Sequence, residues 1–395
     1  MDPEQQEIVE TVRRFVREQI VPLEHNLDPD ASELPAADFD RLAEMTRAMG
    51  LWNLDVPEEF GGPGLSTMTR TLIAMETSQH RAGLYSACYG VFGPGSLAHL
   101  YEADAYQREH YLEPTLRGEK TAFFALTEPS GGSDPARSII TKAVPDGDDW
   151  LLSGSKVFIS GAADADYGLV FARTGGAGSG RKGITCFIVD TDTPGFAVRR
   201  VIHTLRSGHY PTELEFADAR VPGRNVLGAV GEGFSLANDR LSRNRIPYAA
   251  ACIGVAMAAH EMAVDYSKIR TVFSEQLSEH EGIQWMLVDN EIDIRTGSLV
   301  TLQAADLADK GKNFRSAAAV AKIVATEAAS RVVDRCIQIH GGYGVTTDLP
   351  LERWYREMRI RRIGEGTTET QRMIVSRDLL HDKSRKGGAA KLFGS

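Results

Sequence analysis

Hydrophobic and polar positions follow a helical period at the start of the chain. Residues such as Val9, Val12 and Val16 recur every three to four positions and place one apolar stripe toward a core. Two more segments with this period, 39–50 and 70–80, lie on either side of a loop rich in proline and glycine. The first part of the chain, to about residue 122, is therefore predicted to be helical.

From about residue 123 the apolar residues instead gather in short runs rich in β-branched and aromatic side chains. Runs such as WLLSGSKVFIS at 150–160 and ITCFIVDTD at 184–192 are separated by turn sequences such as PDGDD and GGAGSGRKG. No connection between them has the length of a crossover helix, so the pattern predicts an antiparallel sheet or barrel and disfavours a βαβ fold. We expect GGAGSGRKG to be a hairpin loop.

Helical periodicity returns at about residue 229, in long alanine-rich amphipathic stretches typical of a bundle. The pattern therefore predicts an α+β multidomain protein. Its parts are an N-terminal helical domain over 1–122, a middle antiparallel β domain over 123–228, a C-terminal helical bundle over 229–382 and a flexible tail over 383–395. The length of 395 residues agrees with several subdomains, because single cores usually stop growing near about 250–300 residues.

Composition and charge limit the class of partner. The chain is 42% hydrophobic and 25% charged, as expected of a globular enzyme, and its formal net charge of −10 disfavours nucleic acid or an anionic membrane as the main partner. The four cysteines form no C-x-x-C pair, which argues against a disulfide framework, a zinc site or a redox dithiol. The cysteine spacing therefore leads us to expect no metal. The N-terminus has no apolar signal core and no stretch approaches about 18 uninterrupted apolar residues, so we expect a cytoplasmic protein.

One motif, ALTEPSGGSDPAR at 125–137, combines glycines with hydroxyl and acidic residues. It places the hydroxyls of Thr127 and Ser133 beside two glycines that let a ligand approach the backbone closely. Taken alone, the motif also fits an ordinary turn in which Glu128 and Asp134 are plain turn residues. Its chemistry therefore indicates a ligand site only in combination with other motifs.

Two glycine-rich segments lie near the end of the chain. QIHGGYGVTTDLPLERWYRE at 338–357 has three glycines that let the chain turn against a cofactor. IGEGTTETQR at 363–372 carries Glu365 between two glycines, a pattern that by itself favours a solvated loop. Neither a dinucleotide G-x-G-x-x-G after a strand nor a phosphate-binding loop is found, so a nucleotide cofactor would bind without a Rossmann fold.

Together and in this order, these segments resemble the signatures of the acyl-CoA dehydrogenase family over about residues 4–380. The resemblance implies an N-terminal α domain, a middle β domain and a C-terminal four-helix domain, with FAD between the last two and completed by a neighbouring subunit. It also implies that Phe158 packs on the flavin ring, although a strand phenylalanine taken alone is usually core. The cofactor-binding positions carried over are Leu126, Thr127, Ser133, Phe158, Ser160, Arg270, Phe273, Gln338, Gly341, Gly342, Thr367 and Glu369.

The same resemblance makes Glu365 the base of an FAD-dependent α,β-dehydrogenation. Glu365 would remove the α-proton of an acyl-CoA thioester, and N5 of FAD would accept the β-hydride to leave the trans-2-enoyl-CoA. Some members carry the base on an earlier helix before an arginine, but here that pair is Asn244 and Arg245, and asparagine cannot act as a base. Arg245 either assists catalysis at the CoA side or forms a surface salt bridge. The substrate-binding positions are Ser133, Arg245, Gly364 and Gly366.

The resemblance further implies an acyl-CoA substrate, electron-transfer flavoprotein as electron acceptor and a homotetramer. Gly364 stands where straight-chain enzymes often have tyrosine, so we expect a roomier cavity that admits branched or ring-bearing acyl groups. Ser274 follows Phe273 where the family usually has glycine. Three alternatives stay open: an enoyl-CoA reductase running in reverse, a flavin monooxygenase on the same fold and a non-catalytic acyl-CoA-binding protein.

Overall fold

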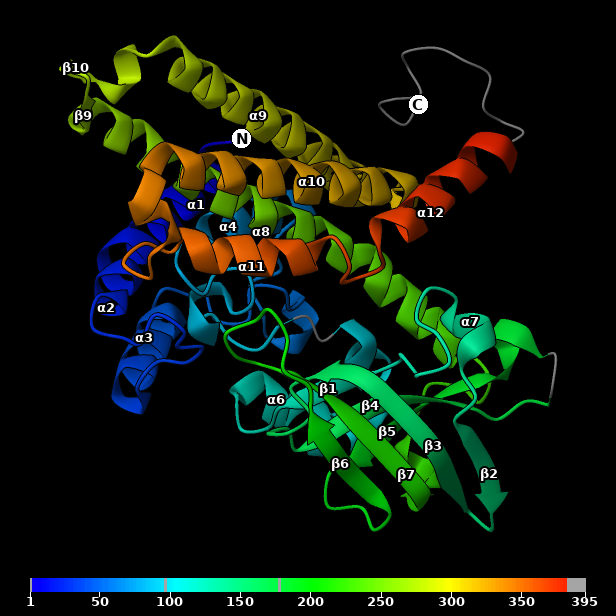
Figure 1. The fold of residues 1–395 in the computed structure, drawn as a ribbon. Helices are drawn as coiled ribbons and strands as arrows, with labels where there is room; N and C mark the ends of the chain where they lie inside the picture. The colour runs from blue at the N-terminus through cyan, green and yellow to red at the C-terminus, as the bar shows by residue number, and fades with distance from the viewer. Residues whose placement is uncertain (1, 96–97, 177–178, 382–395) are drawn as a thin grey trace. The chain divides into compact units, whose positions relative to one another are not determined.

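The structure is a computed structural model that describes residues 2–95, 98–176 and 179–381 (Figure 1). The tail predicted over 383–395 lies outside the described residues. The chain forms two compact units. Unit 1 contains Met1–Glu58, Pro63–Phe92 and Ser242–Ser395, and unit 2 contains Glu59–Gly62 and Gly93–Leu241.

The N-terminal helices of unit 1 form where the sequence predicts them. Helix α1 begins with a capping box, in which the side chains of Asp2 and Gln5 accept from each other's backbone N–H groups. It buries Val9, Val12 and Phe15, the apolar stripe read from the sequence. The helices of this segment are α1 (Pro3–Phe15), α2 (Val21–Glu24), α3 (Ala36–Ala48) and α4 (Thr67–Thr77).

The C-terminal helices of unit 1 pack closely because their contact faces consist of small residues. Alanine side chains of α8 and α10 are fully buried in one core, which also takes up Met75 from α4. At Gly254 in α8 an added Cβ would lie 2.0 Å from the backbone oxygen of Met75, so only glycine allows this approach. Helices α9 and α10 lie side by side (Figure 1). The helices are α8 (Gly233–Ile269), which belongs to unit 1 from Ser242 onward, α9 (Glu281–Asp309), α10 (Arg315–His340), α11 (Leu351–Arg361) and α12 (Thr368–His381).

Helix α8 is the longest helix among the described residues. By length and composition alone it could cross a membrane. Within the protein, 56% of its most apolar window is buried, as is usual for a core helix.

The middle of the chain forms an eight-stranded sheet in unit 2, in the order β6-β7-β3-β2-β4-β5-β8 with β1 beside β4. Neighbouring strands pair antiparallel, as the sequence predicts, except that β4 pairs in parallel with β1 and, at one position, with β2. GGAGSGRKG joins the antiparallel pair β4 and β5, although its residues 177–178 lie outside the described part. The strands are β1 (Ala122–Ala125), β2 (Lys142–Asp146), β3 (Asp149–Ser160), β4 (Tyr167–Arg173), β5 (Ile184–Asp190), β6 (Phe196–Val201), β7 (Pro211–Pro222) and β8 (Val226–Leu227), with short helices α5 (Ala105–Gln107), α6 (Glu113–Arg117) and α7 (Pro135–Ser138).

Strands β4 and β5 are covered on both faces, which explains why their sequences are continuous apolar runs rather than alternating ones. In β4, Leu169 and Phe171 enter one core, whereas Val170 and Ala172 enter the core on the other face. A separate hairpin of β9 (Thr271–Val272) and β10 (Glu275–Gln276) belongs to unit 1. The predicted fold class, helices followed by a β domain and more helices, is confirmed.

Candidate active site

The predicted base, Glu365, lies in the short loop between α11 and α12. Its φ of +56° is in the left-handed region, where a residue with a side chain is strained, and such strain often marks a functional site. The buried Gln371 holds this loop, because its Nε2 donates to the backbone oxygens of Glu365 and Gly366 at 3.1 Å each. An added Cβ at Gly366 would lie 2.6 Å from that Nε2, so the glycine makes room for the amide. This role of Gln371 was not predicted from the sequence.

The carboxylate of Glu365 is half-buried and incompletely hydrogen-bonded. Its Oε1 accepts from Nδ2 of Asn244 at 2.9 Å. Its Oε2 is buried and has no hydrogen-bond partner within the described part of the chain. Asn244, which cannot act as a base, therefore orients the side chain that can. The sequence could have indicated this role, because Asn244 stands at the position where some members of the resembled family carry the base.

Buried cations accompany this carboxylate. Arg245 is 5% exposed, and its Nε and Nη1 lack hydrogen-bond partners among the described residues. Burial lowers the pKa of Arg245 to about 10, although the charge of Glu365 opposes that shift. Lys322 is fully buried and donates to the backbone oxygen of Arg362 at 3.0 Å, and burial lowers its pKa to about 8. Arg245 is thus not a surface salt bridge, and Lys322 is a member of the site that the sequence analysis missed.

Tyr248 fills the space beside the base. An added Cβ at Gly364 would lie 2.6 Å from the hydroxyl of Tyr248. That hydroxyl donates to the backbone oxygen of Arg361 at 3.3 Å, and the guanidinium of Arg361 lies 4.2 Å from the centre of the Tyr248 ring. The space expected to be open at Gly364 is therefore occupied, because the hydroxyl of Tyr248 takes the place of the missing side chain.

In unit 2 a buried ion pair anchors the loop at 125–137. Nζ of Lys156 lies 2.8 Å from Oε1 of Glu128 and also donates to two backbone oxygens. The carboxylate of Glu128 accepts from the backbone N–H groups of Ile140 and Thr141. Burial lowers the pKa of Lys156 to about 8; burial alone would raise the pKa of Glu128, but Lys156 and the hydrogen bonds lower it. Glu128 is therefore more than a turn residue, since it fixes the loop against β3.

Phe158 presents its ring to the surface of unit 2. It has a φ of +58°, at a point where the pairing of β3 with β7 shifts between Val157 and Ile159. Such bulges re-aim a side chain, and Phe158 is 62% exposed. The alternative that Phe158 is a core residue is therefore wrong. The backbone N–H of Val157 donates to the oxygen of Thr127 at 3.0 Å, which places Thr127 next to Phe158.

The other residues predicted in this part of unit 2 differ in exposure. Ser133 and Ser160 are exposed, and Oγ of Ser160 accepts from Arg206 at 3.1 Å. That bond leaves the Ser160 hydroxyl hydrogen for another acceptor. Leu126 is 6% exposed and its side chain belongs to the core, so only its backbone is left for a ligand.

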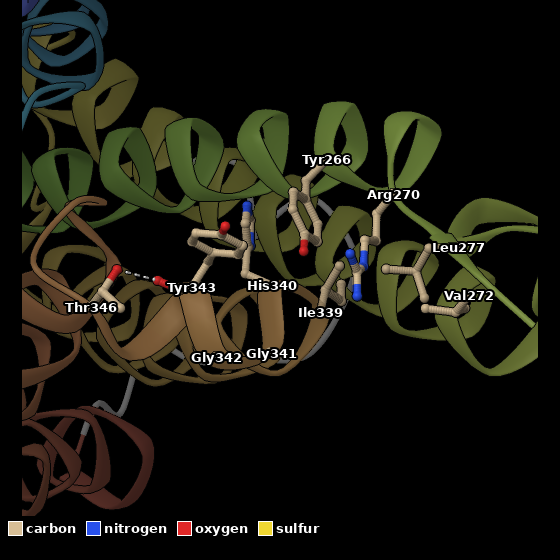
Figure 2. Close-up of a pocket in the computed structure, with 10 residues that line it drawn as sticks. All are labelled: Tyr266, Arg270, Val272, Leu277, Ile339, His340, Gly341, Gly342, Tyr343 and Thr346. Atoms are coloured by element: carbon tan, nitrogen blue, oxygen red, sulfur yellow. Dashed lines mark hydrogen bonds between the residues drawn. The ribbon is translucent and has the colours of Figure 1, made fainter.

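A pocket of about 490 Å³ in unit 1 brings together three predicted cofactor-binding residues (Figure 2). Arg270, Gly341 and Gly342 all line it. The ring of His340, also in the lining, stacks on that of Tyr266 with their centres 4.6 Å apart. Burial lowers the pKa of His340, although a hydrogen bond to a backbone oxygen 2.7 Å from its Nδ1 partly opposes the shift. A neutral, fixed imidazole agrees with the structural role expected for it.

Phe273 and Ser274 form the two-residue turn between β9 and β10. Their φ values of +49° and +71° are both left-handed, as a type I′ turn requires. The glycine usual in the family at this place would adopt that conformation without strain, whereas Ser274 adopts it at a cost. Phe273 is 95% exposed, so its ring is available to another molecule.

The last predicted positions lie at helix ends. Thr367 accepts the backbone N–H of Thr370 at 3.2 Å and so caps α12. Glu369 is exposed in the first turn of α12, and hydrogen bonds from its own backbone and from Thr367 lower its pKa. Gln338 is exposed in the last turn of α10.

Comparisons with known proteins cover nearly the whole of the chain. The acyl-CoA dehydrogenase N-terminal domain matches residues 2–119, the middle domain residues 123–219 and the C-terminal domain residues 231–380. An acyl-CoA dehydrogenase of Bacillus subtilis is 37% identical over 93% of this chain and 96% of its own. A 3-(aryl)acrylate reductase of Clostridium sporogenes is 35% identical over 95% of this chain and 99% of its own.

A solved structure shows the same fold. A chain described with the electron transferring flavoprotein of Acidaminococcus fermentans superposes with a TM-score of 0.85 at 34% identity, over 97% of this chain and 99% of that one. Members of the matched family are flavin-dependent oxidoreductases that carry FAD. This chain therefore belongs to the acyl-CoA dehydrogenase family and is a flavin-dependent oxidoreductase whose cofactor is FAD.

Proposed function

We propose that this enzyme oxidises an acyl-CoA thioester to the trans-2-enoyl-CoA, with Glu365 as the base that removes the α-proton. The observation that carries the proposal is the free carboxylate oxygen of Glu365, buried on a loop fixed by Gln371 while Asn244 orients the other oxygen. An oxygen in this state is ready to accept a proton. A bound thioester would also expel water and raise the basicity of the carboxylate.

Loss of the α-proton places negative charge on the thioester oxygen, which then needs hydrogen-bond donors. The backbone N–H of Glu365 donates to no described residue, so it is available for this purpose. The free Nε and Nη1 of Arg245 supply a positive charge that polarises the site or holds the CoA side. Gly364 and Gly366, which flank the base, and the exposed Ser133 complete the proposed substrate contacts.

The residues present fit FAD. The exposed ring of Phe158 suits a flat partner, and the hydroxyls of Thr127 and Ser160 are the proposed donors to it. Arg270, with its planar paired donors, lines a pocket with Gly341 and Gly342 and suits a diphosphate. When bound, FAD supplies the acceptor for the hydride from Cβ. Leu126, Phe273, Gln338, Thr367 and Glu369 are the remaining proposed cofactor contacts.

We propose a homotetramer, supported by an apolar stripe on α9. Trp285, Val288, Ile292 and Leu299 are each more than half exposed and recur at helical spacing. The exposed ring of Phe273 is a further group that a second subunit would cover. The resemblance to a chain described with an electron transferring flavoprotein supports such a flavoprotein as electron acceptor. We also propose a cytoplasmic location.

One second function is supported by a specific observation, the similarity to a 3-(aryl)acrylate reductase. The same base and cofactor serve reduction of an enoyl group, because Glu365 would then return the proton to Cα. A monooxygenase is disfavoured, since that class usually lacks the base.

An anaerobic titration of the purified flavoprotein with acyl-CoA thioesters tests the proposal. The panel includes linear, branched, aromatic and dicarboxylic members, and bleaching of the visible flavin band is followed. We expect one class to bleach the flavin in the wild type but not in Glu365→Gln. Bound flavin that no thioester reduces, but that an enoyl-CoA reoxidises after chemical reduction, would replace the proposal with the reductase.

A further inference from the structure

Arg361, the last residue of α11, is a buried cation without an acceptor. It is 7% exposed, and its guanidinium forms no hydrogen bond and no ion pair with any residue that the structure describes. Within the described part of the chain, its guanidinium instead lies against two aromatic rings. The guanidinium carbon lies 4.2 Å from the ring centre of Tyr248 and 5.1 Å from that of Tyr85.

Neighbouring arginines show that this state is unusual for the segment. Nε of Arg353 lies 3.0 Å from Glu357, Nε of Arg356 lies 2.8 Å from Glu352, and Nε of Arg362 lies 2.9 Å from Glu327. Oε1 of Glu357 accepts from Arg353, and no carboxylate of a described residue lies within ion-pairing distance of Arg361. Burial lowers the pKa of Arg361, but Tyr248 and other nearby groups, Glu357 among them, raise it above its ordinary value. The guanidinium therefore stays charged, while its N–H donors have no acceptor among the described residues.

The position of Arg361 connects it to the base. Tyr248, over whose ring it lies, occupies the space beside Gly364, the residue directly before Glu365. The other buried cations of this region, Arg245 and Lys322, also lack a carboxylate within ion-pairing distance among the described residues. Positive charge is therefore in excess beside the base, and this excess favours an anionic ligand.

We propose that Arg361 binds a carboxylate at the far end of the acyl chain, so that the enzyme prefers dicarboxylic acyl-CoA substrates. This inference rests on the proposed function and narrows its substrate class. A carboxylate matches the paired N–H donors on the edge of a guanidinium. An aromatic acyl group is a weaker match, because the tyrosine rings already lie against the guanidinium.

Matched pairs of substrates test this inference in the intact flavoprotein. Each pair has equal carbon number and differs in the terminal carboxylate: butyryl- and succinyl-CoA, pentanoyl- and glutaryl-CoA, hexanoyl- and adipoyl-CoA. Anaerobic stopped-flow gives the rate constant of flavin reduction divided by the dissociation constant. For at least one pair we expect the wild type to favour the carboxylate by about 10- to 100-fold, the range of a charge-assisted hydrogen bond.

Variants of two arginines on the same helix provide the comparison. Arg361→Met is expected to abolish or reverse the preference, and Arg361→Lys to keep part of it. Arg359, which is exposed on α11, supplies the matched control, and Arg359→Met is expected to keep the wild-type preference. If Arg361→Met does not retain flavin, the inference is tested by comparing the preference for the carboxylate in the wild type with that in Arg361→Lys.

The outcomes separate the two proposals. If neutral thioesters reduce the wild-type flavin as well as their dicarboxylic partners do, the inference is overturned and the proposed function stands. If no thioester reduces the flavin, the proposed function fails, and calorimetric binding of glutaryl-CoA decides the inference separately. Tight binding that is lost in Arg361→Met supports it, whereas equal binding by wild type and variant overturns it.

Discussion

Two sets of buried charges, one in each unit, differ in how completely they are hydrogen-bonded. In unit 2, Lys156 donates to Glu128 and to two backbone oxygens, and Glu128 accepts from two backbone N–H groups. In unit 1, by contrast, Glu365 keeps a free buried oxygen, and Arg245 keeps free buried donors, among the described residues.

The difference indicates different uses of the same kinds of residue. A buried ion pair with complete hydrogen bonds fixes a loop and has nothing left to offer a ligand. Buried groups without partners cost stability and are kept where a ligand completes them. The set in unit 2 therefore positions the loop that we assign to FAD, and we propose that the set in unit 1 acts on substrate.

The largest effect is expected from breaking the fully hydrogen-bonded ion pair of Lys156 and Glu128 in unit 2. Lys156→Met leaves the carboxylate of Glu128 buried without its cation, which should lower the free energy of unfolding by about 3–5 kcal/mol. Urea unfolding followed by tryptophan fluorescence measures this loss. The double variant Glu128→Leu with Lys156→Met removes both charges and should regain most of it. A single variant as stable as wild type would show that the pair does not fix the loop.

The same ion pair predicts a dependence on pH. The folded pKa of Glu128 is lowered, so its stabilisation is fully present above its ordinary value of 4.5 and is lost as the pH falls below that value. Urea unfolding at a series of pH values should show this loss in the wild type. The double variant should show a shallower decrease below 4.5, and an identical decrease in both proteins would contradict the account.

In unit 1, where the buried charges are only partly hydrogen-bonded, Asn244→Leu removes the donor that orients Glu365. Misplacement of a reacting group costs up to about 100-fold, so we expect flavin reduction by an acyl-CoA to slow by about 10- to 100-fold. The rate is measured over a series of pH values, because a positioning role predicts a changed pH profile as well as a slower reaction. Asn26→Leu, at an exposed position, is the control. An unchanged rate with an unchanged pH profile would rule out a positioning role.

The smallest effect is expected at Arg245, and its direction is opposite to that of Lys156→Met. Arg245→Met removes a buried cation that has no hydrogen bond to lose, so the ligand-free protein should become more stable, by about 0.5–2 kcal/mol. The same variant should oxidise acyl-CoA poorly. Thermal unfolding compared with flavin reduction measures both effects. Marked destabilisation would show that Arg245 is a structural residue like Lys156.

The fold was predictable from sequence because burial imposes a period on the side chains. The stripe through Val9 and Val12 predicts α1, and the short apolar runs predict the strands. The parallel pairing of β1 with β4 could not be predicted, because it joins segments that no turn signal connects. Local patterns describe elements well and their non-local pairing poorly.

Within the site, the motifs identified candidate residues by their type, but the sequence did not predict which side chains surround them. The motif around Glu365 identifies the predicted base. The bulge that exposes Phe158 depends on strand register, and the hydroxyl of Tyr248 reaches Gly364 only because α8 packs near the end of α11. These contacts depend on tertiary packing, which one sequence does not reveal.

The most direct test of the account is the rate of flavin reduction in anaerobic stopped-flow with the acyl-CoA that reduces the wild type fastest. Glu365→Gln keeps the shape of the side chain and removes its basicity, and Glu109→Gln, at an exposed position, is the matched control. We predict that Glu365→Gln retains FAD and slows reduction by at least about 10³-fold, while Glu109→Gln matches the wild type. Reduction of Glu365→Gln at the wild-type rate would contradict the central claim.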